Sequence, residues 1–358
     1  MAHNTQHRIA GARLPQIQSA GTAPAGTAPA GTAPAAASRL GTGVIPVLDV
    51  APLTEPVPDP VAESALADAL RDALTEVGFF FIVNHGVAVE TIELMFDEAR
   101  RLHALPQPVK ESIPMGKTVG GYLGMGGGTS YASDIAGPVR KPNQNEAFFC
   151  HRHGYHTENQ YPPLMHFAER CESYIDQLIE LGARMLPVLA LSLNLQRDAF
   201  DAHFDRPSVS LRMSHYPPMD YDDHEWGLAP HTDSSVFTFL PANDVPGLEI
   251  RPAGHDWIAP PQLSGAYLVN SGDMLKRWTN DMYRSTAHRV RNLSAGDRYA
   301  VPFFYGARDD AVVEPVPTTV SEERPSRHDP ITYGDYQRWF LNRNYELVTG
   351  EKVGSFGS

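Results

Sequence analysis

The most constraining feature of this chain is the triplet His231-Thr232-Asp233, which is followed by His288 and, ten residues later, by Arg298. Two imidazoles and one carboxylate can occupy one face of an octahedral metal ion and leave the opposite face open. This is the ligand set of non-haem Fe(II) oxygenases. Because side chains two residues apart on a β-strand point to the same face, we expect His231 and Asp233 to share a strand. The sequence therefore predicts that His231, Asp233 and His288 bind one metal ion.

The residues around this triplet favour a β-rich fold. An apolar run follows it from Val236 to Leu240, and residues 268–270 and 299–301 have the same character. After Ser208, short strand-like segments alternate with Pro, Gly and Asn, a pattern that is typical of an all-β sandwich or barrel. This part of the chain is therefore predicted to be mainly β.

The preceding part of the chain mixes helical and strand patterns. Helical segments are indicated by apolar residues at a spacing of three to four, and buried strands by short continuous apolar runs. We expect a strand at 45–49, a helix at 62–77, a strand at 79–83 and helices at 90–105 and 169–193. The predicted organisation is an N-terminal α/β region at 42–168, then a long helix, a β-rich core and a C-terminal helix at 169–358.

Residues 1–41 belong to a different compositional class. They are rich in Ala, Gly, Pro and Thr, and GTAPA occurs three times in tandem between Gly21 and Ala35. Such a segment cannot bury enough apolar surface to offset the entropy lost on ordering. We therefore predict a disordered tail that takes no part in the chemistry.

Charge and cysteine content narrow the classes of partner. The formal net charge of −13 argues against nucleic-acid binding, which needs clustered Lys and Arg, and against an anionic membrane surface. The chain has 2 cysteines, Cys150 and Cys171, and it lacks an apolar run as long as the roughly 18 residues of a membrane span. We expect a soluble cytoplasmic protein with reduced thiols and a small-molecule partner, and the sequence leaves its oligomeric state open.

Several motifs occur in the order in which one known family carries them. They are IPVLDVAPL (45–53), EVGFFFIVNHGV (76–87), PHTDSS (230–235), HRVRN (288–292) and DRYAVPFFYG (297–306). Together they resemble the isopenicillin N synthase-like branch of the Fe(II)/2-oxoglutarate-dependent oxygenases, a branch that holds many natural-product dioxygenases. The resemblance implies a double-stranded β-helix (jelly roll) with helices packed outside it and iron in the mouth of the barrel.

The resemblance also implies roles for individual residues. His231, Asp233 and His288 match the family's iron ligands. Arg298 matches the arginine of the R-x-S motif, which pairs with the distal carboxylate of 2-oxoglutarate. Tyr216 matches the tyrosine of the N-x-Y-P motif, which helps to hold the same carboxylate.

Two positions depart from the family pattern. Ala300 replaces the serine of R-x-S, and Ser214 replaces the asparagine of N-x-Y-P, so we take Ser214 as a further candidate contact of 2-oxoglutarate. Arginine can still bind a carboxylate through two parallel hydrogen bonds from its planar guanidinium. Losing one hydroxyl hydrogen bond to a charged group weakens binding by about 1.5–3 kcal/mol unless water or Tyr216 compensates.

The activity implied by the resemblance is oxidation of a small-molecule metabolite that consumes O2 and 2-oxoglutarate and releases succinate and CO2. Hydroxylation is the default outcome, desaturation and cyclisation use the same centre, and ascorbate is a candidate stimulant. Two alternatives stay open. An isopenicillin N synthase-like oxidase has the same triad and uses no 2-oxoglutarate, and succinate release separates it from the first. A catalytically inactive binding protein of the same fold would show no iron-dependent O2 uptake.

Other polar residues have plainer interpretations. Cys150, His151, His153 and His156 suggest a second metal cluster, but strand alternation would bring only His151 and His153 to one face, so a structural or pocket-lining role is favoured. His215 is interpreted as a pocket residue or a support for a ligand.

Two further segments are interpreted from their local sequence. Residues 120–128 are expected to be a flexible loop that carries Tyr122 to the pocket rim. Residues 333–348 have near-helical apolar spacing, with Trp339 as a prominent member, and are expected to be either a packing helix or a lid over the iron site.

Overall fold

The computed structural model describes residues 38–40, 43–116, 119–128, 141–154, 158–222 and 224–344. Most of the predicted tail, together with His156 and residues 345–348, lies outside the described residues. Ser38–Leu40 form strand β1, which pairs antiparallel with β2, so the end of the predicted tail belongs to the fold.

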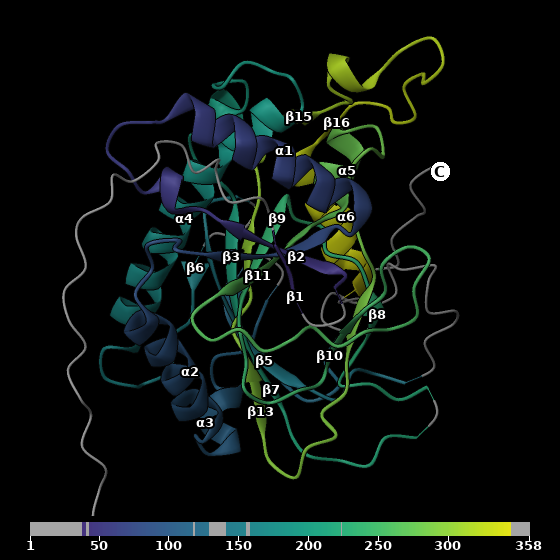
Figure 1. Ribbon diagram of the computed structural model, residues 1–358. Coiled ribbons are helices and arrows are strands. Elements are labelled where there is room, and N and C mark those ends of the chain that lie inside the picture. The colour runs from purple at the N-terminus through teal and green to yellow at the C-terminus, as the bar shows by residue number, and fades with distance from the viewer. Residues whose placement is uncertain are drawn as a thin grey trace, which may run out of the picture. The chain divides into compact units, whose positions relative to one another are not determined.

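The main element is a large sheet of 11 strands, most of whose pairs are antiparallel (Figure 1). Along the sheet the order is β1 (Ser38–Leu40), β2 (Ile45–Asp49), β3 (Phe79–Val83), β11 (Tyr267–Ser271), β9 (Phe237–Pro241), β14 (Phe303–Tyr305), β7 (Val209–Tyr216), β5 (Glu146–Arg152), β4 (Val119–Leu123) and β6 (Glu158–Asn159). Strand β13 (Arg298–Ala300) leaves this path and pairs with β7.

A smaller sheet has the order β10 (Leu248–Ile250), β12 (His288–Val290) and β8 (Leu228–His231). Its inner face packs on the large sheet, because Val290, Leu228 and Leu248 contact Tyr216 and Ala300. Two sheets that meet in this way form the predicted jelly roll. A separate two-stranded pair joins β15 (Val312–Val313) and β16 (Ile331–Thr332).

Three long helices pack on the large sheet: α1 (Pro60–Glu76), α2 (Val89–His103) and α4 (Phe167–Ser192) (Figure 1). The other helices are α3 (Gln107–Glu111), α5 (Asp273–Trp278) and α6 (Tyr333–Asn344), of which α6 lies beside β8 of the smaller sheet. Short 3-10 turns occur at Ala51–Leu53, Asp201–His203 and Pro317–Thr319. Within the described ranges, no helix is long and apolar enough to cross a membrane.

The N-terminal elements follow from local sequence signals. Asp59 caps α1, because its carboxylate accepts hydrogen bonds from the backbone N–H groups of Val61 (2.9 Å) and Ala62 (3.3 Å). Gly78 follows the end of α1 and has a φ of +74°, the left-handed conformation in which many helices end. Strand β3 is apolar throughout because it is buried on both faces. Phe80 and Ile82 enter the main core, and Phe79 and Phe81 enter a second cluster.

The expected loop at 120–128 is partly wrong. Its first residues belong to β4, which pairs antiparallel with β5. Tyr122 is buried and donates a hydrogen bond to Glu146 instead of reaching the pocket rim.

Candidate active site

The three predicted metal ligands meet at one end of the smaller sheet. His231 is the last residue of β8 and pairs directly with His288, the first residue of β12. Their ring centroids are 4.1 Å apart. The expectation that Asp233 shares a strand with His231 is wrong, because Asp233 lies beyond the end of β8. The loop still turns its carboxylate back toward both rings.

The spacing of the three side chains leaves room for an ion. The Oδ1 atom of Asp233 lies 3.7 Å from Nε2 of His231 and 3.6 Å from Nε2 of His288. Ligand atoms that are each about 2.1 Å from a metal, at octahedral or tetrahedral angles, lie about 3.0–3.4 Å apart. A small inward movement of the side chains would therefore complete a coordination sphere.

Both imidazoles are oriented by backbone carbonyls. Nδ1 of His231 is 2.8 Å from the carbonyl of Ala229, and Nδ1 of His288 is 3.2 Å from that of Thr286. A carbonyl only accepts, so each Nδ1 carries the proton and each Nε2 can present its lone pair to a metal. Metal-bound histidines commonly have this support.

The carboxylate is oriented in the same way. Oδ2 of Asp233 accepts hydrogen bonds from Oγ1 of Thr238 at 2.7 Å and from Nδ2 of Asn270 at 2.8 Å. These two donors fix the carboxylate plane. They leave Oδ1 free to face the two imidazoles.

The protonation states suit a metal. Burial and the neighbouring His288 lower the pKa of His231 to about 3. Burial opposes the ionisation of Asp233, but His288 and the Thr238 hydroxyl outweigh it and hold the Asp233 pKa below its usual range. Burial also opposes a charge on His288, yet the Asp233 carboxylate raises the His288 pKa, so an incoming ion would displace a proton from His288.

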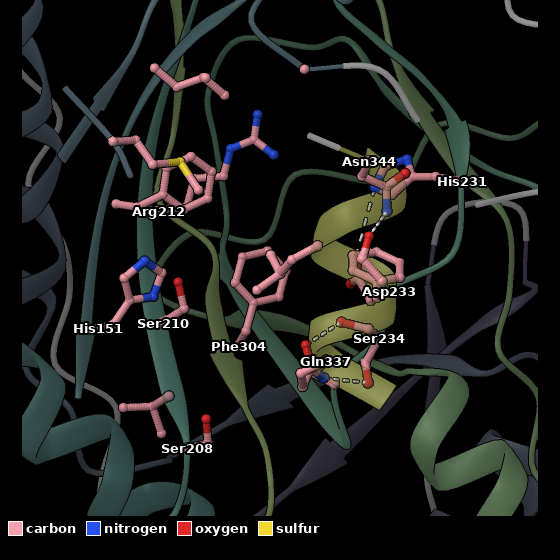
Figure 2. A pocket seen from close by; sticks show the side chains of 18 of the residues that line it. His151, Ser208, Ser210, Arg212, His231, Asp233, Ser234, Phe304, Gln337 and Asn344 are labelled. Carbon is pink, nitrogen blue, oxygen red and sulfur yellow. Dashed lines mark hydrogen bonds and ion pairs between the residues drawn. The ribbon is translucent and has the colours of Figure 1, made fainter. Parts of the chain in front are cut away.

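A cavity of about 130 Å³ opens beside this group (Figure 2). Strands β5 and β7 form one wall, and His231, Asp233 and helix α6 form the opposite one. The lining is largely apolar and includes Phe149, Leu228, Phe304, Phe340 and Leu341. An apolar cavity with a few polar groups is the usual form of a small-molecule site.

His151 lines this cavity, which confirms the pocket-lining interpretation of that residue. The other described members of the suggested second metal cluster do not join it. Cys150 is fully buried in the main core, and His153 lies beyond the end of β5 with φ of +59° and is exposed.

Arg212 extends from β7 into the cavity (Figure 2). It is 8% exposed, and its Nη2 donates to Oδ1 of Asn145 at 2.9 Å. The guanidinium carbon lies 5.3 Å from the ring centre of Phe149. Nε has no hydrogen-bond partner, and no carboxylate in the described part of the chain pairs with the guanidinium. Sequence reasoning missed Arg212, although its position four residues before Tyr216 on one strand places both side chains on the same face.

Arg298 and Tyr216 come together as predicted. They are direct partners in the pairing of β13 with β7, and the guanidinium carbon lies 5.2 Å from the Tyr216 ring centre. Arg298 is 2% exposed, and its Nε donates to the carbonyl of Val245 at 3.2 Å, while Nη1 has no partner in the described structure. Burial lowers the Arg298 pKa, but an arginine stays charged at neutral pH.

The two departures from the family pattern face each other. Ala300 pairs with Ser214 in the same strand register, two residues along from the pair of Arg298 and Tyr216. The hydroxyl of Ser214 is buried and has no hydrogen-bond partner among the described residues. It therefore lies across from the position at which the R-x-S serine would stand.

Helix α6 forms part of the cavity wall. The side chain of Gln337 accepts from the Ser234 hydroxyl at 3.1 Å and donates to the Ser234 carbonyl at 3.1 Å. Phe340, Leu341 and Asn344 also line the cavity. Trp339, the residue singled out from the sequence, instead packs on Tyr336 with ring centroids 5.3 Å apart.

Comparisons with known proteins agree with this geometry. Residues 207–307 match the family model of the 2OG-Fe(II) oxygenase superfamily, and residues 45–168 match that of the non-haem dioxygenase in morphine synthesis N-terminal. The 2-oxoglutarate-Fe(II) type oxidoreductase hxnY of Emericella nidulans is 30% identical over 289 residues, which cover 75% of this chain and 81% of that protein.

Two solved structures have the same fold. The crystal structure of JOX2 in complex with 2OG, Fe and JA is 26% identical, with a TM-score of 0.68, and the match covers 82% of this chain and 83% of that one. The dioxygenase for auxin oxidation from rice is 27% identical, with a TM-score of 0.64, and the match covers 87% and 97%.

Proposed function

The chain belongs to the 2OG-Fe(II) oxygenase superfamily, and from this premise we propose that it hydroxylates a small molecule that carries a carboxylate. It is a 2-oxoglutarate-dependent dioxygenase that acts on small molecules. The observation that carries the proposal is a largely apolar cavity that has His231 and Asp233 of the triad at one edge and the buried guanidinium of Arg212 in its lining.

His231, Asp233 and His288 hold Fe(II) in this proposal. The donor set, the spacing and the backbone support of each ligand fit the ion. When bound, Fe(II) couples the oxidative decarboxylation of 2-oxoglutarate by O2 to the oxidation of a substrate C–H bond. The chain itself orients the ligands and lines the cavity with largely apolar side chains. Desaturation and cyclisation need the same arrangement.

Arg298 and Tyr216 hold the distal carboxylate of 2-oxoglutarate. Nη1 of the buried Arg298 guanidinium has no partner among the residues described, which is costly without a counter-ion, and a carboxylate supplies two acceptors that match its fork. Ser214 donates the hydroxyl hydrogen bond that Ala300 cannot. Its Oγ lies on the facing strand and has no hydrogen-bond partner in the part of the chain that the structure describes, which supports this role.

Arg212 recognises the substrate. It is a buried cation with no counter-ion among the residues that the structure describes. Its charge also helps to lower the pKa of the nearby His231. An anionic substrate group would satisfy the free Nε, while Phe149, Leu228 and Phe304 would contact an apolar body. A small carboxylic acid therefore fits the cavity best.

A panel of small carboxylic acids and their amides, assayed for succinate release and product mass, tests this function. Arg212→Gln is expected to raise the KM for the acid by more than tenfold, because truncating a buried charge partner costs about 2–5 kcal/mol. The KM for 2-oxoglutarate and the iron content should not change.

The matched control is Arg308→Gln, in which an arginine paired with acids at the surface is replaced. Equal turnover of acid and amide by the unaltered chain would contradict the assignment of Arg212. Substrate oxidation with O2 uptake and no succinate would favour the isopenicillin N synthase-like alternative.

A separate prediction concerns α6, whose cavity-facing side restrains the reacting substrate in this proposal. Phe340→Ala is expected to raise the ratio of succinate to oxidised product several-fold, because water gains access to the cavity. Since Phe340 is only half-buried, the melting temperature should fall by only a few degrees. Trp339→Ala serves as the comparison, because Trp339 packs on Tyr336 and neither residue lines the cavity. Uncoupling in Trp339→Ala without uncoupling in Phe340→Ala would contradict this role.

A further inference from the structure

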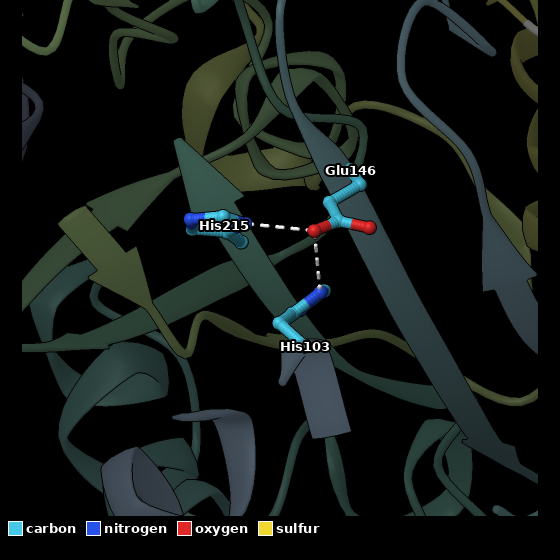
Figure 3. Close-up of side chains that lie close together, drawn as sticks. All are labelled: His103, Glu146 and His215. Atoms are coloured by element: carbon cyan, nitrogen blue, oxygen red, sulfur yellow. Dashed lines mark hydrogen bonds and ion pairs between the residues drawn. The ribbon is translucent and has the colours of Figure 1, made fainter. Parts of the chain in front are cut away.

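A second group of two histidines and one carboxylate lies away from the cavity (Figure 3). His103 ends α2, Glu146 begins β5, and His215 lies on β7. Oε1 of Glu146 is 2.7 Å from Nδ1 of His215 and 3.3 Å from Nδ1 of His103. All three residues are buried or nearly so.

Further charged groups extend this cluster, which we call the Glu146 network. Nζ of Lys110 donates to Oε2 of Glu146 at 2.7 Å, and the Tyr122 hydroxyl donates to the same oxygen. On the other side, Nε2 of His215 lies 2.8 Å from Oδ1 of Asp297. The network therefore runs from α3 through β5 and β7 to the residue before β13.

The geometry indicates a shared proton in place of a metal ion. A separation of 2.7 Å between Nδ1 of His215 and Oε1 of Glu146 is a hydrogen-bond distance, and it is shorter than the about 3.0–3.4 Å that separates two ligand atoms of one metal ion. In the His231, Asp233 and His288 group the corresponding distances are 3.6 and 3.7 Å. Lys110 already supplies a cation to the other carboxylate oxygen.

His215 is held as an imidazolium. Both of its nitrogens face carboxylates, so both must carry a proton to donate. Burial disfavours this charge, but the hydrogen bonds to Glu146 and Asp297 outweigh burial and raise the His215 pKa. Two cations, Lys110 and His215, then balance two carboxylates.

The Glu146 network lies behind the residues that hold 2-oxoglutarate. His215 pairs with Tyr299 across β7 and β13, and the two rings stack at 4.9 Å. Because side chains alternate along a strand, Tyr216 and Arg298 point to the opposite face. Asp297 directly precedes Arg298. Strand β13 has 3 residues and pairs with β7 alone among the described strands, so the bond from His215 to Asp297 fixes its start.

We propose that His215, held between Glu146 and Asp297, is a positioning residue for 2-oxoglutarate, and that its proton makes cosubstrate binding depend on pH. This inference rests on the proposed role of Arg298 and Tyr216. The two hydrogen bonds of the imidazolium join β5, β7 and the start of β13, and they set the direction in which Arg298 enters the barrel. Losing one of them would let β13 shift relative to Tyr216.

The pH dependence has a definite sign. A raised pKa means that the contribution of His215 is complete at low pH and is lost as pH rises through the folded-state pKa, which lies above the ordinary value of 6.5. The groups that face His215 are Glu146, Asp297, His103, Lys110, Tyr122 and Tyr299. Burial lowers the pKa of His103, and burial raises the pKa of Tyr122 and of Tyr299, so these three keep their neutral forms around neutral pH.

The test uses the full iron-loaded chain without oxygen and measures 2-oxoglutarate binding by titration calorimetry. Asp297→Asn removes one charge at a half-exposed site, and His215→Gln removes the imidazolium. Each is expected to raise the 2-oxoglutarate Kd and KM about tenfold, the usual scale for residues that orient a binding group. Iron content and kcat at saturating 2-oxoglutarate should stay within about twofold.

The pH profile separates positioning from general stability. In the unaltered chain the 2-oxoglutarate Kd should rise with pH above the His215 pKa, and in His215→Gln this rise should vanish. His166→Gln, which removes an exposed histidine paired with Glu169, is the matched control and should keep the unaltered profile. An unchanged Kd in folded Asp297→Asn and His215→Gln would overturn the inference while leaving the proposed function intact. Failure of the unaltered chain to bind 2-oxoglutarate would overturn both.

Discussion

Asp233→Ala is expected to abolish turnover and to reduce the iron retained per chain, because it removes the anionic ligand of the site. The Asp233 Oδ1 atom faces both imidazole Nε2 atoms at 3.6–3.7 Å, so its removal leaves two neutral ligands and no anionic one. The change also leaves the Thr238 hydroxyl and the Asn270 amide without their shared acceptor. Iron content by elemental analysis and turnover by succinate release measure the two effects.

Three further variants test the other two ligands and provide a control. His231→Ala and His288→Ala should each abolish turnover, because each removes one of the three proposed ligands. Asp256→Ala, which removes an exposed carboxylate, should retain both iron and activity. Full iron-dependent activity in Asp233→Ala would mean that the metal is bound elsewhere.

Much of the fold could be predicted from local patterns. The strands at 45–49 and 79–83 have the predicted bounds, because a short apolar run that ends at Gly or at polar residues has few alternatives to a buried strand. Helix α1 begins at Pro60, two residues before the predicted start, because the Asp59 cap is not part of the apolar periodicity.

Strand β4 could not be predicted, because its glycines indicate a loop. A Cβ atom at Gly120 would lie 2.7 Å from the Phe149 carbonyl, and one at Gly121 would lie 2.5 Å from the Ile113 carbonyl. The glycines are therefore required by close packing within the sheet, which no local pattern reveals.

The site was predictable where a motif is contiguous and less so where it depends on topology. His231, Asp233 and His288 lie together as predicted. The expectation that His231 and Asp233 share one strand, which came from the alternation of side chains along a strand, was wrong. The Glu146 network joins α2, α3, β4, β5, β7 and the residue before β13, and only the strand register brings His215 next to both carboxylates. The sequence could have pointed to Arg212. It lies four residues before Tyr216 on the same strand, so both side chains point to the same face, inside the barrel.

Arg298→Ala is expected to raise the apparent KM for 2-oxoglutarate by more than tenfold while iron binding is preserved. Arg298 is a fully buried cation whose Nη1 has no described partner, and it lies against Tyr216, so a carboxylate at this point would gain charge-assisted hydrogen bonds. Truncating a buried charged donor typically costs about 2–5 kcal/mol of binding. Steady-state kinetics with 2-oxoglutarate as the varied substrate, together with iron analysis, measure the effect.

Conservative changes at the same strand pair distinguish charge from geometry. Arg298→Lys keeps the charge but loses the planar fork, so its KM should lie between those of the unaltered chain and Arg298→Ala. Ala300→Ser restores the hydroxyl opposite Ser214 and should leave the KM equal or lower, whereas Ser214→Ala should raise it, because Ala300 offers no replacement hydroxyl. An unchanged KM in Arg298→Ala would place the cosubstrate carboxylate elsewhere. The guanidinium of Arg212, which has no carboxylate partner among the described residues, would then be the alternative to test.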